Sequence, residues 1–205
     1  MTSERPYHHG DLANALLAAV EEIVLERGPT GVTLREAARR AGVSHSAPAH
    51  HFGDKDGMIC AFAEVGFGLL GDRLMAEFTA VVGRPVREQL SAMGRAYLAF
   101  AAEHPAHYEV MMGPKGPRDE ATTDRRLQEA GERAFLPLAL LVNRLVEEGV
   151  VAPERGRYAA TMLWGMCHGI ADLWLAGTLP HFFEDHTYEQ LADAVIDDLT
   201  DLIVG

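Results

Sequence analysis

The sequence predicts an all-α protein, with a helix-turn-helix head of three helices at the N-terminus and a larger helical body behind it. Apolar residues recur at helical spacing along most of the 205 residues, and no stretch shows the strict apolar and polar alternation typical of strands. Proline and glycine divide the chain into about nine helical segments. An apolar fraction of 48% is sufficient for a real core.

The first predicted helix ends at Gly28, which Pro29 follows directly. One face of this helix carries five apolar residues at helical spacing: Leu12, Leu16, Ala19, Val20 and Ile23. Glycine followed by proline is a stop signal for a helix. We expect this helix to be the first of the three in the head.

The segment from Thr33 to Gly57 is the most informative part of the chain. Thr33 and Glu36 stand in capping-box register, in which the hydroxyl accepts a bond from the amide three residues on and the carboxylate reaches back. A narrow stripe of small or apolar side chains follows at i, i+3, i+4 and i+7: Leu34, Ala37, Ala38 and Ala41. The pattern predicts a second helix that a neighbour can approach closely.

A glycine-containing turn comes next. Gly42 can adopt the positive φ that ends a helix, Val43 can fill the corner, and Ser44 is a good N-cap for a third helix. Two helices joined by three or four residues that include a glycine form the helix-turn-helix motif, which reads the DNA major groove.

This segment resembles the DNA-binding signature of TetR-type transcriptional regulators. The matching residues are Thr33, Ala37-Ala38, Ala41-Gly42-Val43-Ser44, His50-His51-Phe52 and Asp54-Lys55-Asp56. One departure concerns Ala49, where the family usually has a tyrosine that contacts a phosphate. Pro48 precedes it as the fourth residue after the Ser44 cap, where its missing N–H is barely needed because the first four amides of a helix lack partners.

The motif assigns base contacts to the start of the third helix. His45, Ser46 and Ala47 open this helix, and His50 lies one turn further along the same side. Histidine and serine can form hydrogen bonds with bases, and an alanine methyl can contact a thymine methyl.

Phosphate contacts are assigned to Thr33, Arg35 and Lys55, because two of these residues stand at helix N-termini, which attract anions. The full predicted DNA-binding set is Thr33, Arg35, Ser44, His45, Ser46, Ala47, His50 and Lys55. Arg39 and Arg40 fit either further phosphate contacts or a solvated helix face.

A long fourth helix should start at the Asp54 cap and run to about Val82. Its expected buried face consists of Met58, Phe62, Val65 and Leu69. Further helices are expected near residues 86–103, 105–112, 119–148, 154–176 and 187–203. We divide the chain into a DNA-binding domain of residues 1–57, which extends to about 71 with the linking helix, and a ligand-binding and dimerisation domain of residues 58–205.

A narrower resemblance appears in the body. The residues Tyr97, His104-Pro105, Tyr108 and Met111-Met112, followed by Trp164 to Gly169, are similar to a TetR subgroup named for a Trp…His-Gly motif. The N-terminal residues Tyr7 to Leu12 also occur in that subgroup. The resemblance implies a C-terminal domain that binds a small molecule, which it does not identify.

Aromatic and methionine side chains suit an apolar small-molecule pocket. The predicted ligand-binding residues are Tyr97, Phe100, Tyr108, Met111, Met112, Trp164 and His168. Trp164, His168 and Asp172 follow one another at i, i+4 on one helix face. That face fits a ligand cavity and a structural His–Asp pair in a core or subunit interface equally well.

The last predicted helix carries a stripe that needs a partner: Leu191, Val195, Leu199 and Leu202. Together with a matching face on residues 154–176, it would form a four-helix bundle between two subunits. We also expect a homodimer because one recognition helix contacts too few base pairs for useful sequence specificity.

The charge of −12 is distributed unevenly. Residues 1–57 hold six Lys/Arg against eight Asp/Glu, a net of −2, so most of the acidic excess lies outside the head.

No nucleotide-cofactor or catalytic motif is recognised, and Cys167-His168 is not a catalytic dyad because neighbouring residues on a helix diverge. His8-His9 and His50-His51 diverge for the same reason, so no metal site is predicted.

Cys60 and Cys167 are the only cysteines, which indicates neither a disulfide framework nor a zinc knuckle. The N-terminus has no apolar signal segment, and the longest unbroken apolar run is too short for a membrane span. We expect a cytoplasmic protein without cofactor or membrane partner.

The preferred interpretation is a ligand-responsive regulator, not an enzyme, that represses transcription by binding a palindromic DNA operator as a homodimer. A small apolar or amphipathic effector would release it by favouring a different body shape. The alternative is an acidic helical ligand-binding or enzymatic bundle whose head no longer binds DNA.

Overall fold

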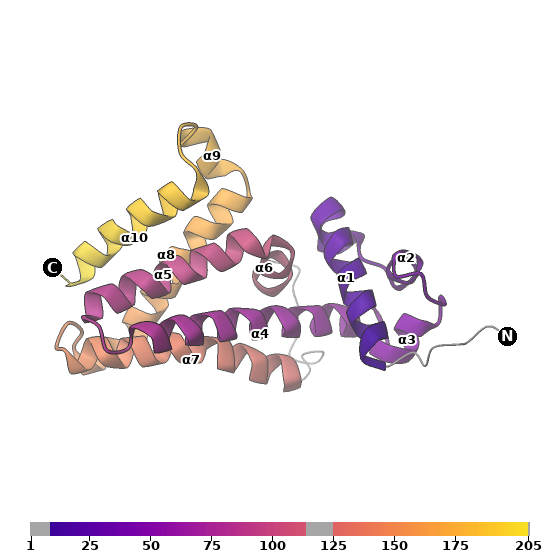
Figure 1. Ribbon diagram of the computed structural model, residues 1–205, viewed down its shortest axis with the longest axis horizontal. Coiled ribbons are helices and arrows are strands. Elements are labelled where there is room, and N and C mark those ends of the chain that lie inside the picture. The colour runs from indigo at the N-terminus through magenta and orange to yellow at the C-terminus, as the bar shows by residue number, and fades with distance from the viewer. Residues whose placement is uncertain (1–8, 114–124, 205) are drawn as a thin grey trace. The chain divides into compact units, whose positions relative to one another are not determined.

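A computed structural model of the chain describes residues 9–113 and 125–204, and every regular element in this part is helical (Figure 1). Residues 9–113 and 125–204 form ten α-helices and two short 3-10 helices, which confirms the predicted all-α fold. None of the helices in the described part combines the length and the apolar character needed to cross a bilayer. Tyr7 and His8 of the N-terminal motif, and the expected helical residues 119–124, lie outside the described residues.

The chain forms two compact units, the first of which contains the head. Its helices are α1 (His9–Arg27), α2 (Leu34–Arg40), α3 (Ala47–Phe52), the first part of α4 (Lys55–Val81) and α6 (Pro105–Met112). The predicted stripe of small residues is buried, since Ala37 and Ala38 are 0% exposed. Leu16, Val20 and Ile23 of α1 are also 0% exposed, so α1 and α2 share one small core.

Helix α6 belongs to this first unit although it follows α5 in the sequence. The buried imidazole of His107 stacks on the Phe62 ring of α4, with 4.1 Å between ring centroids. Gly66 of α4 leaves room for Met111 of α6, whose sulfur would overlap a Cβ added at that glycine. The first unit therefore combines the head with a later helix, and the functional boundary at residue 57 stays a prediction.

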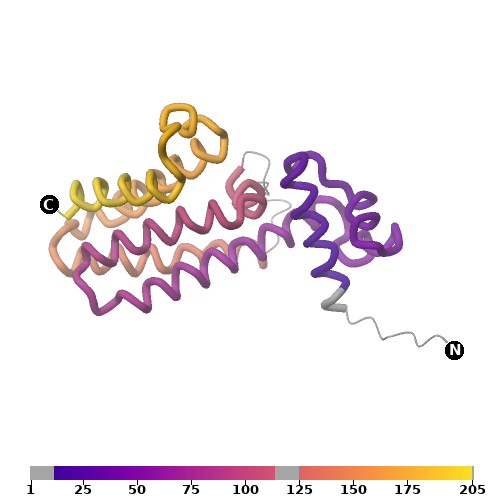
Figure 2. The backbone as a smooth tube through the Cα atoms, turned by 45° about the horizontal axis from the view of Figure 1, so that its top comes forward, coloured from indigo at the N-terminus to yellow at the C-terminus, as the bar shows by residue number. Residues whose placement is uncertain are grey.

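The second unit contains the later part of α4, α5 (Val86–Glu103), most of α7 (Arg125–Glu147), α8 (Gly156–Leu175), α9 (Thr178–Phe182) and α10 (Tyr188–Val204). Helix α7 runs beside the later part of α4 (Figure 2), where a Cβ at Gly71 would lie only 3.2 Å from the Cα of Ala134. Helix α10 packs on α5, where Gly94 makes room for the buried side chain of Ile196.

Two expectations about these helices were wrong. The break at Gly177 to Pro180 contains the short helix α9, because Gly177 at φ 76° ends α8 and Pro180 then sits in the first turn of the next helix, where no N–H is needed. On α4, Val65 and Leu69 are 42% and 39% exposed. The buried face continues from Phe62 through Gly66 instead, because α6 packs against that glycine.

Candidate functional site

The turn between α2 and α3 has the predicted geometry. The Thr33 hydroxyl accepts a hydrogen bond from the Glu36 amide at 3.2 Å, which caps α2. Gly42 lies at φ 67°, and the Val43 amide donates to the Ala38 carbonyl at 3.0 Å, as in a glycine-terminated helix. The second half of the predicted capping box is absent, because the Glu36 carboxylate accepts bonds from arginine side chains instead.

The third helix begins later than predicted. Its first residue is Ala47, and Ser44 is not its N-cap. The Ser44 carbonyl accepts from the Ala47 amide at 3.0 Å, which is a tight turn and not an α-helical bond. Pro48 explains this, because a proline has no N–H for the carbonyl four residues earlier and its ring collides with that carbonyl. His45 and Ser46 therefore belong to the turn that precedes α3.

The predicted base-contacting residues remain accessible in this arrangement. His45, Ser46 and His50 are exposed, and Ala47 is half-buried. The Ser44 and Ser46 hydroxyl oxygens lie 3.3 Å apart, within hydrogen-bond distance. Next to them, the His51 ring packs edge-on against Phe52 with 4.6 Å between centroids. The structure thus presents three polar side chains on a short turn and helix.

The start of α4 supplies a positive charge. Asp54 caps this helix, since its carboxylate accepts from the Gly57 amide at 2.8 Å. The Lys55 ammonium lies 3.5 Å from the Thr30 carbonyl and forms no ion pair with any residue that the structure describes. Arg35 on α2 is exposed and also lacks an ion-pair partner within the described ranges.

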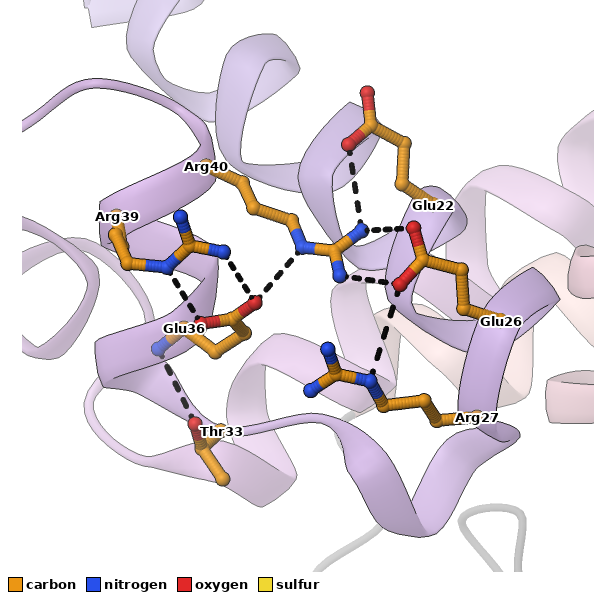
Figure 3. A network of polar contacts seen from close by, with 7 residues as sticks. All are labelled: Glu22, Glu26, Arg27, Thr33, Glu36, Arg39 and Arg40. Carbon is orange, nitrogen blue, oxygen red and sulfur yellow. Dashed lines mark hydrogen bonds and ion pairs between the residues drawn. The ribbon is translucent and has the colours of Figure 1, made fainter.

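Arg40 behaves differently, because it joins α1 to α2 (Figure 3). Its guanidinium donates to Glu26 of α1 at 2.5 and 2.8 Å and to Glu36 of α2 at 2.9 Å. A third carboxylate, that of Glu22, lies 3.6 Å away. Only 11% of the Arg40 side chain is exposed. Arg40 is therefore a structural tie between two helices of the head.

Arg39 completes this network from its edge. It donates to both carboxylate oxygens of Glu36, at 2.7 and 2.8 Å, but 63% of its side chain is exposed. Hydrogen bonds from Arg39 and then Arg40 lower the pKa of the Glu36 carboxyl from 4.5 to about 2. A hydrogen bond from Arg40 likewise lowers the pKa of Glu26. Glu36 and Glu26 therefore stay ionised at a lower pH than an ordinary glutamate does.

In the second unit, a polar chain links α5 to α8. The Tyr97 hydroxyl lies 3.2 Å from Nδ1 of His168, whose Nε2 lies 3.4 Å from a carboxylate oxygen of Asp172. The indole of Trp164 packs against His168 and edge-on against Phe135. Its buried Nε1 has no hydrogen-bond partner among the described residues. A buried donor without an acceptor suits a site that a ligand could complete.

The other predicted ligand residues are mostly core. Phe100 in the second unit is 1% exposed, whereas Tyr108 and Met111 of α6 in the first unit are 2% and 8% exposed. Met112 is half-buried. Each unit thus contributes apolar side chains, and the assignment of these residues to one pocket stays a prediction.

The predicted dimer stripe is only partly accessible in one subunit, and its place in a subunit interface stays a prediction. Leu191 and Leu199 are each 4% exposed within one subunit, because the face of α10 that carries them packs inside the chain. Val195 is half-buried, and only Leu202, at 81%, is freely accessible. Helix α8, which contains most of the expected matching face on residues 154–176, carries the exposed apolar side chains of Tyr158, Met162, Met166 and Leu173, which had not been named individually. Their helical spacing was the signal that could have identified them.

Two family models match the chain. The model of bacterial regulatory proteins of the tetR family matches residues 16–67, and the tetracyclin repressor-like C-terminal domain matches residues 90–199. The first match covers the helix-turn-helix segment, and the second covers more than half of the chain. Neither description mentions the Trp…His-Gly subgroup, which stays a prediction.

Individual proteins agree with these models. The HTH-type transcriptional regulator BetI of Pectobacterium atrosepticum is 26% identical over 178 residues, which cover 86% of this chain and 85% of that protein. A protein of unknown function from Rhodococcus sp. RHA1 has a TM-score of 0.78 and 30% identity, over 98% of this chain and all of that one. AibR, solved with isovaleryl coenzyme A and operator DNA, has a TM-score of 0.68 and 17% identity, over 90% of this chain and 96% of that one.

The chain belongs to the tetR family of bacterial regulatory proteins. It is a DNA-binding transcriptional regulator, and the alternative of a bundle that has lost DNA binding is not favoured.

Proposed function

Starting from this family membership, we propose that the protein is a ligand-responsive repressor that reads its operator with the turn and helix of residues 44–50. The observation that carries the proposal is the exposure of His45, Ser46 and His50, together with two cations, Arg35 and Lys55, that have no carboxylate partner among the residues the structure describes. Histidine and serine side chains can exchange hydrogen bonds with base edges, and the Ala47 methyl can contact a thymine methyl.

Phosphate contacts are assigned to the helix starts on either side of this segment. Arg35 and Lys55 supply the charge, and Thr33 stands at the N-terminus of α2, where amides attract anions. Because Arg40 is held by three carboxylates, it contributes no free charge to DNA. With so few free cations we expect a shallow salt dependence of DNA binding.

Two copies of the chain are proposed to form the DNA-binding dimer through α8. The exposed side chains of Tyr158, Met162 and Leu173 supply an apolar surface, and Leu202 near the end of α10 is exposed as well. A two-fold axis would place two heads on half-sites about one helical turn of DNA, roughly 34–36 Å, apart.

The effector is proposed to be a small, largely apolar or amphipathic molecule with a hydrogen-bond acceptor. The indole N–H of Trp164, which has no hydrogen-bond partner in the described part of the chain and lies beside the Tyr97–His168 pair, supports an acceptor on the ligand. AibR, which has the same fold, was solved with an acyl coenzyme A and operator DNA. The ligand must prefer the subunit shape that does not fit the operator, because equal affinity for both shapes would shift nothing.

We further propose that the protein catalyses no reaction and works in the cytoplasm, beside the DNA it regulates. The support is its membership of a family of transcriptional regulators.

Selection of binding sites from random duplex DNA tests the proposal. An enriched palindrome whose half-sites change when His45 or Ser46 is replaced by alanine supports it. If no sequence is enriched at low salt, or if the enriched sequence is indifferent to both substitutions, base reading by this segment is wrong.

A further inference from the structure

Arg35 and Arg39 stand four residues apart on α2, and both side chains are exposed. Residues at this spacing lie on the same face of a helix. The first helix of a helix-turn-helix crosses the DNA backbone. We base the inference on the proposed contact between Arg35 and a phosphate. Because Arg39 lies on the same helix face, it comes to the DNA backbone one helical turn further along.

The obstacle to a phosphate contact is that Arg39 already has a partner. Both of its hydrogen bonds go to Glu36, which is only 20% exposed and ionised. A free arginine would be a simple contact, whereas Arg39 must release a carboxylate to bind a phosphate. Whether that release is costly depends on what remains with Glu36 afterwards.

Arg40 remains with Glu36. Its Nε donates to Oε1 of Glu36 at 2.9 Å, the same oxygen that accepts from Arg39. The other Arg40 nitrogens are fixed by Glu26 of α1, so Arg40 does not move when Arg39 leaves. Glu36 thus keeps a charge-assisted bond after Arg39 has left it, and no unpaired carboxylate remains at the edge of the DNA site.

We propose that Arg39 is a DNA phosphate contact that acts by exchange: it swings from Glu36 to a phosphate while Arg40 stays and neutralises Glu36. An exposed ion pair is weak, so little is lost when Arg39 leaves. The guanidinium can bind a phosphate through two parallel hydrogen bonds, as it binds a carboxylate. This contact also releases counterions from the DNA. Arg40 is then the positioning residue, and Arg39 the contact.

The test compares the salt dependence of DNA binding among variants of the full-length protein. Binding is measured on the selected operator and on a scrambled duplex. For Arg39→Gln we expect the slope of log K against log salt to become shallower by about 0.9 on both duplexes. Arg39→Lys keeps the slope, because the charge remains. Arg40→Gln leaves the slope unchanged and lowers the melting temperature, with Arg40→Lys as a milder variant if the first does not fold.

A second arm tests the exchange itself. Glu36→Gln should tighten binding about two- to fivefold, because Arg39 no longer leaves an ion pair. This gain should vanish in the Arg39→Gln background. Glu26→Gln is the matched control: it removes the same charge from the same network but does not contact Arg39, and it should change affinity by less than twofold.

Three results overturn the inference. An unchanged slope in Arg39→Gln, together with a shallower slope in Arg35→Gln, leaves the proposed DNA site intact and makes Arg39 a solvated side chain. A gain in Glu36→Gln that persists without Arg39, or equals that of Glu26→Gln, is a general charge effect and refutes the exchange. If neither arginine affects the slope, the placement of α2 on the DNA backbone fails, and the inference fails with it.

Discussion

Two helix pairs in this protein are joined by different physical means. In the head, α1 and α2 are tied by Arg40, which bonds carboxylates on both helices. In the body, α5 and α10 meet through the close approach of Ile196 to Gly94, and the ion pairs of Arg95 with Asp193 and Asp197 lie on the outside. The difference follows from size: α2 has seven residues and buries two alanines, whereas α5 and α10 have 18 and 17 residues.

The two units should lose stability through different kinds of substitution. A short helix with small side chains gains little from apolar burial, so an ionic tie has a large share in holding it. The long helices of the body are held by packing, which is insensitive to pH but sensitive to changes in volume. The chain offers one buried cysteine in each unit, Cys60 in the first and Cys167 in the second, as separate reporters.

The largest effect is expected at Ile196. Its side chain is 1% exposed against α5, so Ile196→Ala should lower the free energy of unfolding by about 2–5 kcal/mol. Ile196→Val, which removes one methylene, should cost only about 0.5–1.5 kcal/mol. Urea unfolding followed by tryptophan fluorescence measures this loss in the body, because Trp164 and Trp174 both lie in the second unit. If both variants lost the same free energy of unfolding, the contact between α5 and α10 would not be packed as described.

Two glycines with open space around them should respond in opposite directions. Apart from the glycine itself, its chain neighbours and the local helix backbone, no atom of the described residues lies within 4 Å of a Cβ built at Gly42 in the head or at Gly131 in α7. Gly42 has φ 67°, so Gly42→Ala should cost about 1–2 kcal/mol through backbone strain alone. Gly131 lies inside a helix, and Gly131→Ala should stabilise by about 0.5–1 kcal/mol. Thermal melts of both variants check the signs, and a stabilising Gly42→Ala would refute the turn geometry.

Loss of the ionic tie should loosen the head and leave the body unchanged. In Arg40→Gln, two or three carboxylates lose their common partner, so α1 and α2 should separate more often. We expect faster labelling of Cys60 by a thiol reagent in the native protein, with Cys167 unaffected. Burial raises the pKa of the Cys167 thiol to about 11, so this thiol reacts only when the body opens. Ile196→Ala should show the reverse pattern, and equal acceleration of both cysteines in Arg40→Gln would contradict two separate units of stability.

The smallest effect is a difference in acid sensitivity. The ordinary pKa of a glutamate, 4.5, falls to about 2 at Glu36 in the folded head. The Glu36 ion pairs therefore stabilise the head fully above pH 4.5, and this contribution is lost as the pH falls from 4.5 toward 2. Hydrogen exchange of the α2 amides should accelerate across that window before tryptophan fluorescence reports any change in the body. In Glu36→Gln the acceleration should be weaker, and an unchanged pH profile would assign it to other carboxylates.

The sequence by itself determined the helices, most of their ends and the family. Thr33, Gly42 and Asp54 act through hydrogen bonds between residues three to five positions apart, so their roles could be predicted from the local sequence. The same locality explains why the signature of the head was recognisable. Even the late start of α3 has a local cause in Pro48, which the sequence analysis considered but placed too far into the helix.

Only the tertiary structure decided which face of each helix is covered and which partner each charge takes. Leu191 and Leu199 were expected to meet a face on residues 154–176 in a bundle between two subunits, whereas packing on α5 buries them within one subunit. The Glu36 carboxylate was expected to accept a bond from the backbone amide of Thr33, but Arg40, held in place by Glu26 of another helix, offers it a stronger charge-assisted bond. Helical periodicity shows that a residue lies on an apolar face, but the burial of that face depends on helices brought close from distant parts of the chain.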